Sequence, residues 1–158
     1  MKFNALIPEL SVSNFDASLA FYTKILGFKI EYSRENFAFL SFQGSQIMIE
    51  KINDHWKTGE LLYPFGRGLN FQIEVKDLDV IIKSLKKGRY PLFREPSDNW
   101  YRKENKLLGC REALVQDPDG YVLRFSQSIG IKNEKEHLDH KNQKNRYVFI
   151  TGRKKQKR

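Results

Sequence analysis

The sequence predicts an α+β fold built from two copies of one strand-helix-three-strand unit (βαβββ). First, a pattern repeats, because shifting the numbering by 63 places Val12 on Val75 and Asn14 on Asp77. Second, apolar residues recur at helical spacing after both of these polar positions. Third, residues 112–127 form two apolar, β-prone runs around Asp-Pro-Asp-Gly, which is the pattern of a hairpin.

The first copy is expected at about residues 4–60. Asn14 is a good N-cap for a helix, and Gly27 is expected to end that helix. The apolar residues of the helix recur at its own period, as Phe15, Leu19, Tyr22 and Leu26. Strands are expected before the helix at residues 5–12 and after it at 28–33, 37–42 and 46–52.

The second copy is expected at about residues 66–128. A strand at 69–75 leads to a helix at 78–87, which Asp77 caps and Gly88 ends. Residues 90–94 are expected to form a further strand. After them we expect a long polar loop at 95–109, which holds Trp100 and Tyr101, and then the hairpin.

Arg124 lies in the second strand of the predicted hairpin. Because side chains alternate along a strand, Tyr121, Leu123 and Phe125 share one face and Arg124 lies on the other. A buried guanidinium needs a partner, so we expect Arg124 to pair with Glu50 or Glu9.

One βαβββ unit cannot close its sheet alone, so the two copies are expected to pair around a cup with the helices outside. Such a cup is a natural place for a small ligand, because its concave walls exclude water. Residues 1–130 should therefore form one domain, and its unpaired edge strands favour a homodimer. Residues 131–158 are expected to be a basic, largely flexible tail.

The net charge of +9 belongs mainly to this tail. Ten of the 28 basic residues, but only three of the 19 acidic ones, lie at or after Ile131, which leaves +2 for residues 1–130. A nearly neutral body argues against a groove that tracks phosphates. The sequence also lacks a phosphate-binding loop, a nucleophile elbow and a Cys-x-x-Cys pair.

A single cysteine, Cys110, excludes a disulfide within the chain and suits a reducing compartment. The first residues lack the apolar core of a signal peptide, and no run of about 18 apolar residues occurs. We therefore expect a cytoplasmic protein with no membrane contact.

The order of elements, together with two motifs, resembles the vicinal oxygen chelate superfamily, which includes glyoxalase I, extradiol dioxygenases and bleomycin-resistance proteins. The motifs are Phe-Tyr-x-x-x-Leu-Gly-Phe at residues 21–28 and Asp-Pro-Asp-Gly-Tyr at 117–121. In the enzymes of this superfamily, inward His, Gln or Glu side chains hold a divalent metal. The corresponding positions here are Ile7, Glu50, Asn70 and Arg124, of which only Glu50 is a good ligand.

The resemblance is greatest to the bleomycin-resistance branch, which ends its last strands as Ala113–Gly120 and Leu123-Arg124 do. Members of that branch bind the antibiotic without modifying it, in clefts between two subunits. The resemblance therefore implies an antibiotic-binding protein without metal or cofactor. Its ligand should lie against Phe37, Phe39, Glu50, Trp56, Asn70, Trp100, Tyr101 and Arg124, with Glu9, Asp54 and Glu60 as further acids for a cationic ligand.

Two alternatives stay open. The first is a lyase, transferase or dioxygenase of the same superfamily, with its metal on displaced ligands such as Glu9, Glu50 and Gln72. The second is an interaction module that binds nucleic acid or another anionic surface through its basic tail.

Overall fold

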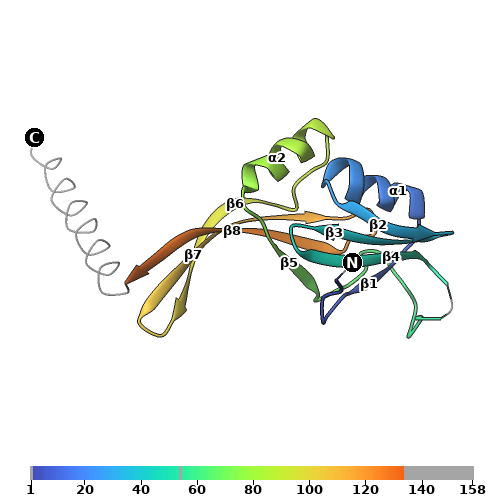
Figure 1. Ribbon diagram of the computed structural model, residues 1–158, viewed down its shortest axis with the longest axis horizontal. Coiled ribbons are helices and arrows are strands. Elements are labelled where there is room, and N and C mark those ends of the chain that lie inside the picture. Colours follow the sequence, from blue (N-terminus) through green and yellow to red (C-terminus); the bar gives the residue numbers. More distant parts are fainter. Residues whose placement is uncertain (1, 54, 134–158) are drawn as a thin grey trace, which may run out of the picture. The chain divides into compact units, whose positions relative to one another are not determined.

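A computed structural model gives the fold and describes residues 2–53 and 55–133 (Figure 1). The chain divides into two compact units. The first consists of Met1–Ser97 and Glu112–Gln127, and the second of Asp98–Arg111 and Ser128–Arg158. The expected tail begins within strand β8, which continues to Asn133; the rest of the tail lies outside the described residues.

Two four-stranded sheets confirm the predicted duplication, because their strands follow the same order. The first sheet has the order β1-β4-β3-β2, and the second has the order β5-β8-β7-β6. In each sheet the first strand of the copy runs parallel to the last. The strands are β1 (Glu9–Val12), β2 (Lys29–Arg34), β3 (Phe37–Phe42), β4 (Ser45–Lys51), β5 (Asn70–Glu74), β6 (Arg94–Lys103), β7 (Lys106–Gln116) and β8 (Val122–Asn133).

Both predicted helix caps are present. Asn14 accepts a hydrogen bond from the Ala17 backbone N–H ahead of α1 (Phe15–Ala20), and Asp77 accepts one from Asp79 ahead of α2 (Leu78–Lys87). These side chains satisfy backbone donors that the first helical turn leaves free.

The first helix differs from the prediction in its second half. After α1 the chain widens into a π-helical turn, η1 (Phe21–Ile25), in which the Leu26 N–H bonds to the Phe21 carbonyl five residues back. Spacing alone could not distinguish this wider turn from a continued α-helix. As expected, the turn ends at Gly27, whose φ is +81°.

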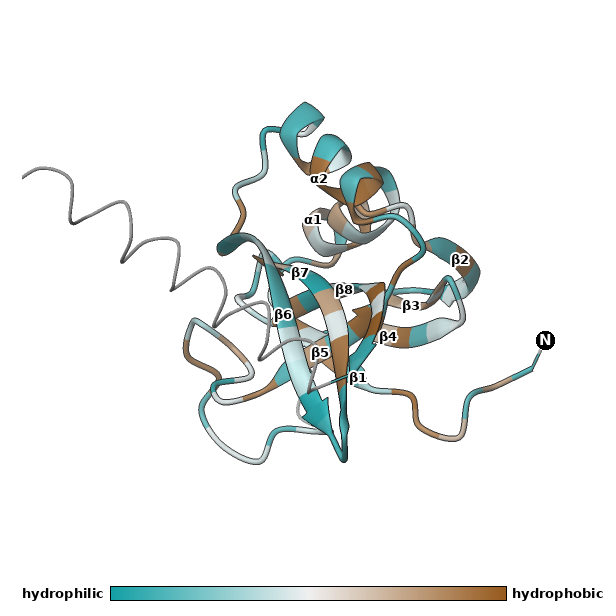
Figure 2. Ribbon diagram, turned by 90° about the vertical axis from the view of Figure 1, so that its left-hand side faces the viewer, coloured by the Kyte–Doolittle hydropathy of each residue, from teal (hydrophilic) through white to brown (hydrophobic). Residues whose placement is uncertain are grey.

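Both helices lie on one side of the strands of the first unit (Figure 1). Each sheet turns apolar side chains toward them, such as Ile49 of β4 and Leu123 of β8, and both residues are fully buried. The helix α2 is two-sided, with Leu78, Ile81, Ile82 and Leu85 buried and mostly polar residues, besides the exposed Val80, elsewhere around it (Figure 2). The core thus occupies the helix side of the sheets.

The Asp-Pro-Asp-Gly turn of the second copy binds the first copy through two buried carboxylates. Asp117 accepts hydrogen bonds from the Tyr22 hydroxyl and from the backbone N–H groups of Asp119 and Tyr121. Asp119 accepts from the backbone N–H of Ser13, at 3.1 Å to each of its oxygens. Burial raises the pKa of Asp117 to about 6, although these hydrogen bonds act in the opposite direction.

Gly120 is required in this turn for two reasons. Its φ of +88° favours glycine, and a Cβ there would lie 2.5 Å from the Cβ of Pro64. Glycine at this position of the turn therefore allows the close contact with Pro64, which lies in the segment between the two copies.

The predicted strand at 90–94 and the predicted loop at 95–109 were wrong. Residues 90–92 have no regular structure, whereas Arg94–Lys103 form β6 and Lys106 begins β7. The strand β6 is at the edge of its sheet and mostly exposed, so it carries polar residues that resemble a loop in sequence.

The second unit contains its own packed aromatic residue. Trp100 lies under the ammonium of Lys132, which is 3.8 Å from the ring centroid. A Cβ at Gly109 would lie 2.6 Å from the same ring, so only glycine allows this close packing. Arg111 and Asp98 form an ion pair at 3.7 Å in this unit.

Candidate ligand-binding site

A shift of strand register determines which side chains reach the face of the first sheet opposite the core. The pairing of β2 with β3 shifts between Ile30 and Tyr32. Beyond the shift, Tyr32 pairs with Phe39 and Arg34 pairs with Phe37. Because paired residues share a face, the shift places Tyr32 and Arg34 beside the two phenylalanines.

We call this surface the acidic aromatic face. It is formed by the side chains that alternate with the core residues of β1, β3 and β4, together with two from β2. Its members are Glu9, Tyr32, Arg34, Phe37, Phe39, Met48 and Glu50.

Aromatic rings form the floor of this face. Tyr32 stacks on Phe39 with ring centroids 5.3 Å apart, and it tilts against Phe37 at 5.7 Å. Phe3 approaches Phe39 edge-on at 5.4 Å. Phe37 and Phe39 are almost fully buried, yet neither belongs to the core cluster. Their burial comes from side chains on their own face, and a flat ligand could replace some of those contacts.

Two carboxyl groups and one guanidinium lie at the edge of the floor. Burial raises the pKa of Glu9, and so do its hydrogen bond with Glu50 and the charge of Glu50, whereas Arg34 acts in the opposite direction. Arg34 contacts Glu50 at 3.5 Å, and its guanidinium lies 3.6 Å from the centroid of the Phe37 ring. The face thus already binds a planar cation of the chain itself.

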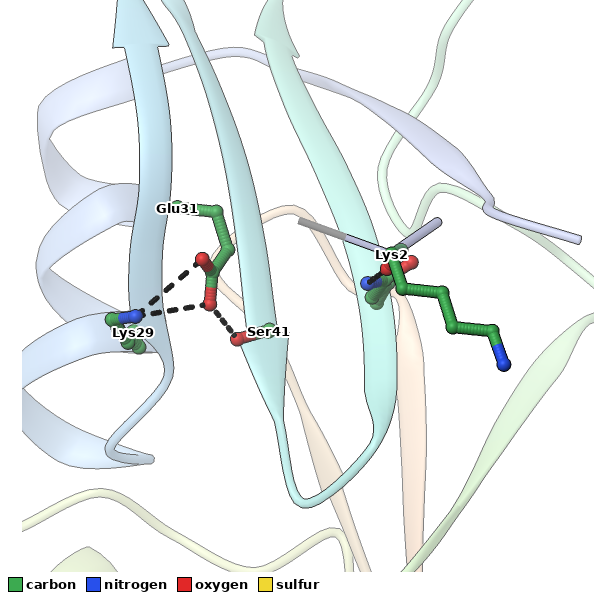
Figure 3. Close-up of polar contacts among 5 residues, drawn as sticks. Lys2, Lys29, Glu31 and Ser41 are labelled. Atoms are coloured by element: carbon green, nitrogen blue, oxygen red, sulfur yellow. Dashed lines mark hydrogen bonds and ion pairs between the residues drawn. The ribbon is translucent and has the colours of Figure 1, made fainter. Parts of the chain in front are cut away.

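A second polar group lies nearby on the same sheet. Figure 3 shows the Ser41 hydroxyl and the Lys29 ammonium meeting at the carboxylate of Glu31. Ser41 donates to Glu31 at 2.6 Å, and this hydrogen bond is the main reason why the pKa of Glu31 lies below its usual value. Glu31 is therefore engaged, and Glu9 and Glu50 are the carboxyls beside the aromatic floor.

The second sheet places Arg124 differently from the prediction. Its guanidinium pairs with Glu112 at 3.5 Å and donates to the Gln72 side chain at 2.7 Å, not to Glu50 or Glu9. Gln72 lies opposite Arg124 in the register of β5 and β8, and Glu112 lies on β7, which adjoins β8. Arg124 therefore forms the expected ion pair, but with a different partner. The neighbouring strands β5 and β7 provide its partners, so it does not pair with a residue of the first sheet.

Of the eight predicted ligand residues, the structure brings Phe37, Phe39 and Glu50 together on the acidic aromatic face. Asn70 and Arg124 lie on the second sheet. Trp56 is 63 % exposed in the loop after β4, and Trp100 and Tyr101 belong to the second unit. Among the further acids, Glu9 is on the face, Glu60 lies in the loop and Asp54 is outside the described residues.

The four positions that correspond to metal ligands do not fit a divalent ion. Ile7 has no donor atom, and Asn70 offers only a neutral amide. Glu50 is paired with Arg34, and Arg124 is itself a cation. Within residues 2–53 and 55–133, no three or more His, Cys, Asp or Glu side chains are grouped so as to hold a metal ion.

A separate cavity of about 420 Å³ lies beside the Asp-Pro-Asp-Gly turn. Sequence reasoning did not find it, because its walls come from segments far apart in the chain. Asp117 faces it with all of its hydrogen bonds made inside the protein, so this carboxylate is not free to bind a ligand. The lining residues are Tyr63, Tyr90, Pro91, Leu92, Phe93, Gln116, Asp117 and Pro118.

Comparisons with known proteins agree with this fold. The family described as "Glyoxalase/Bleomycin resistance protein/Dioxygenase superfamily" matches residues 5–125. A search of curated proteins gives no match. In the described part of the chain, no helix has the length and apolar character needed to cross a membrane.

Three solved structures illustrate the likeness. TioX from Micromonospora sp. ML1 has 16% identity and a TM-score of 0.63, over 80% of this chain and 100% of its own. A glyoxalase/bleomycin resistance protein/dioxygenase from Alicyclobacillus acidocaldarius has 20% identity and a TM-score of 0.56, over 80% of this chain and 92% of its own. Lactoylglutathione lyase from Agrobacterium tumefaciens has 14% identity and a TM-score of 0.53, over 80% of this chain and 96% of its own. At these identities the likeness concerns the fold alone.

Proposed function

Because the chain belongs to the glyoxalase/bleomycin resistance protein/dioxygenase superfamily, we propose that it is a metal-independent small-molecule-binding protein of the bleomycin-resistance type. It sequesters an aromatic, cationic ligand of the bleomycin kind without changing it. We further propose that it acts as a cytoplasmic homodimer, in which the edge strands of the sheets meet those of a second copy.

The acidic aromatic face is the observation that carries the proposal. Phe37 and Phe39 offer a flat apolar floor, and Tyr32 stacks beside them. Glu9 and Glu50 place negative charge at the edge of that floor. A heterocycle with a positive charge finds both of its requirements on this one surface.

The chemistry of the second sheet supports binding without a metal. Arg124 occupies the position that corresponds to the last metal ligand of the superfamily's enzymes. It pairs with the buried Glu112 and so compensates the charge of that glutamate. A guanidinium at that position repels a divalent cation. Catalysis through a metal at these positions would therefore need a different set of ligands.

A titration with metal-free bleomycin tests the proposal. We expect calorimetry to give saturable binding in the presence of EDTA, and tight, stoichiometric uptake of the drug. The variant Tyr32→Ala should bind more weakly by about 1 kcal/mol, because one stacked ring is lost. Tyr63→Ala is the matched control, since Tyr63 is also an exposed tyrosine but lines the separate cavity beside the Asp-Pro-Asp-Gly turn, and its loss should leave the affinity unchanged.

A metal-dependent enzyme of the same superfamily is the other candidate. It stays open because lactoylglutathione lyase is among the proteins with a similar fold. In that case purified protein should contain about one equivalent of a divalent metal by elemental analysis, and EDTA should abolish ligand binding. Loss of Glu9 and Glu50 together should then release the metal.

A further inference from the structure

Arg34 occupies a defined place on the acidic aromatic face. Its guanidinium lies 3.6 Å from the centroid of the Phe37 ring and 3.5 Å from an oxygen of Glu50. The guanidinium thus stacks on the Phe37 ring and pairs with Glu50 at one edge, while 59% of the Arg34 side chain is exposed. An ion pair that is exposed to this extent holds Arg34 only weakly.

Phe3 covers the neighbouring part of the floor. The segment that carries it is attached to β4, because Gln46 accepts from the Asn4 N–H at 2.7 Å and donates to the Lys2 carbonyl at 2.8 Å. Figure 3 shows Lys2 beside this strand. Phe3 and Phe39 meet in a T-shaped arrangement, and Phe3 is 56% exposed. An edge contact of this kind can be exchanged for a ring that lies flat.

These two side chains define the chemistry that the face accepts. A planar, delocalised cation fits between the Phe37 ring and Glu50, and an aromatic ring fits next to it on Phe39. Both subsites are therefore held by the chain's own groups. A ligand must compete with these groups for its contacts, and its apparent affinity falls by the fraction of time for which they occupy the face.

We propose that Arg34 and Phe3 are internal competitors for the ligand, and that the ligand is an aryl amidine or guanidine whose planar cation replaces the Arg34 guanidinium on Phe37 and Glu50. The inference rests on the proposed function, since it names the ligand class of the same site. An anionic ligand would behave in the opposite way, because it would use Arg34 as its anchor.

The experiment uses three small probes of one shape: benzamidinium chloride, neutral benzamide and sodium benzoate. Binding is followed by the NMR signal of the Met48 methyl group, because Met48 lies opposite Phe39 on the same face. The protein is the full chain at about pH 8, because Glu9, whose pKa is raised, is more fully ionised there than at lower pH.

Arg34→Ala should bind benzamidinium about fivefold to tenfold more tightly than the wild type, because an exposed ion pair and one cation–π contact no longer compete. Arg34→Ala should leave benzamide unchanged. Phe3→Ala should tighten both benzamidinium and benzamide by about twofold to fivefold, because it frees the apolar subsite that both probes share. Glu50→Gln should remove the preference for the cation.

Arg111→Ala is the matched control. Arg111 is also an exposed arginine in an ion pair, with Asp98, but it belongs to the second unit. Its loss changes the net charge by the same amount as the loss of Arg34, so a general charge effect would appear equally in both variants. We expect no change in benzamidinium affinity for this control.

The inference is overturned if Arg34→Ala binds benzamidinium no better than the wild type, or if benzoate is the preferred probe. If the Met48 signal responds to benzamide and benzamidinium alike in every variant, the ligand class is wrong, but the face is still a binding site. If Met48 responds neither to the probes nor to bleomycin, the proposed function fails as well. Circular dichroism confirms in each case that the variant is folded.

Discussion

The two sheets have the same strand order but offer different chemistry on the face away from the core. On the first sheet, the arginine of β2 is largely exposed and lies on an aromatic ring beside Glu50. On the second, Arg124 of β8 pairs with Glu112, which is only 3 % exposed. The two faces thus hold one largely exposed cation and one cation that pairs with a buried carboxylate.

The difference shows which face can exchange partners. Removing Arg34 from Glu50 uncovers groups that are already partly in water, whereas removing Arg124 leaves Glu112 charged inside the protein without its guanidinium. We therefore assign ligand exchange to the first sheet and a structural role to the ion pair of the second. The following predictions test this comparison, from the largest expected effect to the smallest.

The contact that joins the copies should be the most sensitive. Asp117→Ala should lower the free energy of unfolding by about 4 kcal/mol, because two backbone N–H groups and the Tyr22 hydroxyl lose their acceptor in the interior. Urea unfolding at pH 7 measures the change. Asp117→Asn is the control and should cost about 1 kcal/mol, since its amide oxygen can still accept. Equal losses in both variants would contradict this account of the turn.

Asp117 should also make stability depend on pH. Its folded-state pKa of about 6 is higher than its usual value of 3.8, so the folded protein binds the proton more tightly. The resulting stabilisation is fully present below about pH 4 and is lost as the pH rises through 6, a change of about 3 kcal/mol. The difference in unfolding free energy between wild type and Asp117→Asn, measured from pH 4 to 7, should show this slope. A flat difference would refute the raised pKa.

The two arginines should differ in their effect on stability. Arg124→Leu should destabilise the protein by about 3 kcal/mol, because the buried Glu112 loses its counter-ion. Arg34→Leu should cost less than about 1 kcal/mol, since that ion pair is exposed. Urea unfolding of the two variants side by side makes the comparison, and similar losses would remove the distinction between the sheets.

The smallest expected effect is on the titration of Glu9. Glu50→Gln should lower the pKa of Glu9 toward its usual value of 4.5, because one neighbouring charge is lost. Arg34→Ala should raise that pKa further, because Arg34 opposes the shift. Carboxyl-carbon NMR measures both changes, and a shift of the same sign in both variants would show that these three groups are not coupled.

The sequence was sufficient to predict the features that depend on a few neighbouring residues, namely helix caps and turns. Asn14 and Asp77 cap their helices as predicted, and the hairpin at Asp117–Gly120 closes where turn residues require it. The edge strand β6 was missed because an exposed strand needs no apolar alternation, so its polar residues carry no periodic signal.

The candidate site was less predictable. The sequence could place Phe37, Phe39 and Glu50 on the side of their strands away from the core because alternation along β3 and β4 is regular; their role in binding stays a prediction. Tyr32 and Arg34 were missed because strict alternation along β2 would turn them toward the core, and the register shift that reverses them has no clear sequence mark. The partner of Arg124 was wrong because pairing between neighbouring strands depends on strand order, which the sequence left open.

The most direct test of the account is the methyl NMR signal of Met48 during a titration with metal-free bleomycin in EDTA. Met48 and Met1 are the two methionines of the chain, so the signal is easily assigned. The account predicts a saturable shift of the Met48 signal, weakened in Tyr32→Ala and unaffected in Tyr63→Ala. Bleomycin that binds without moving this signal, or that binds only after a divalent metal is added, would contradict it.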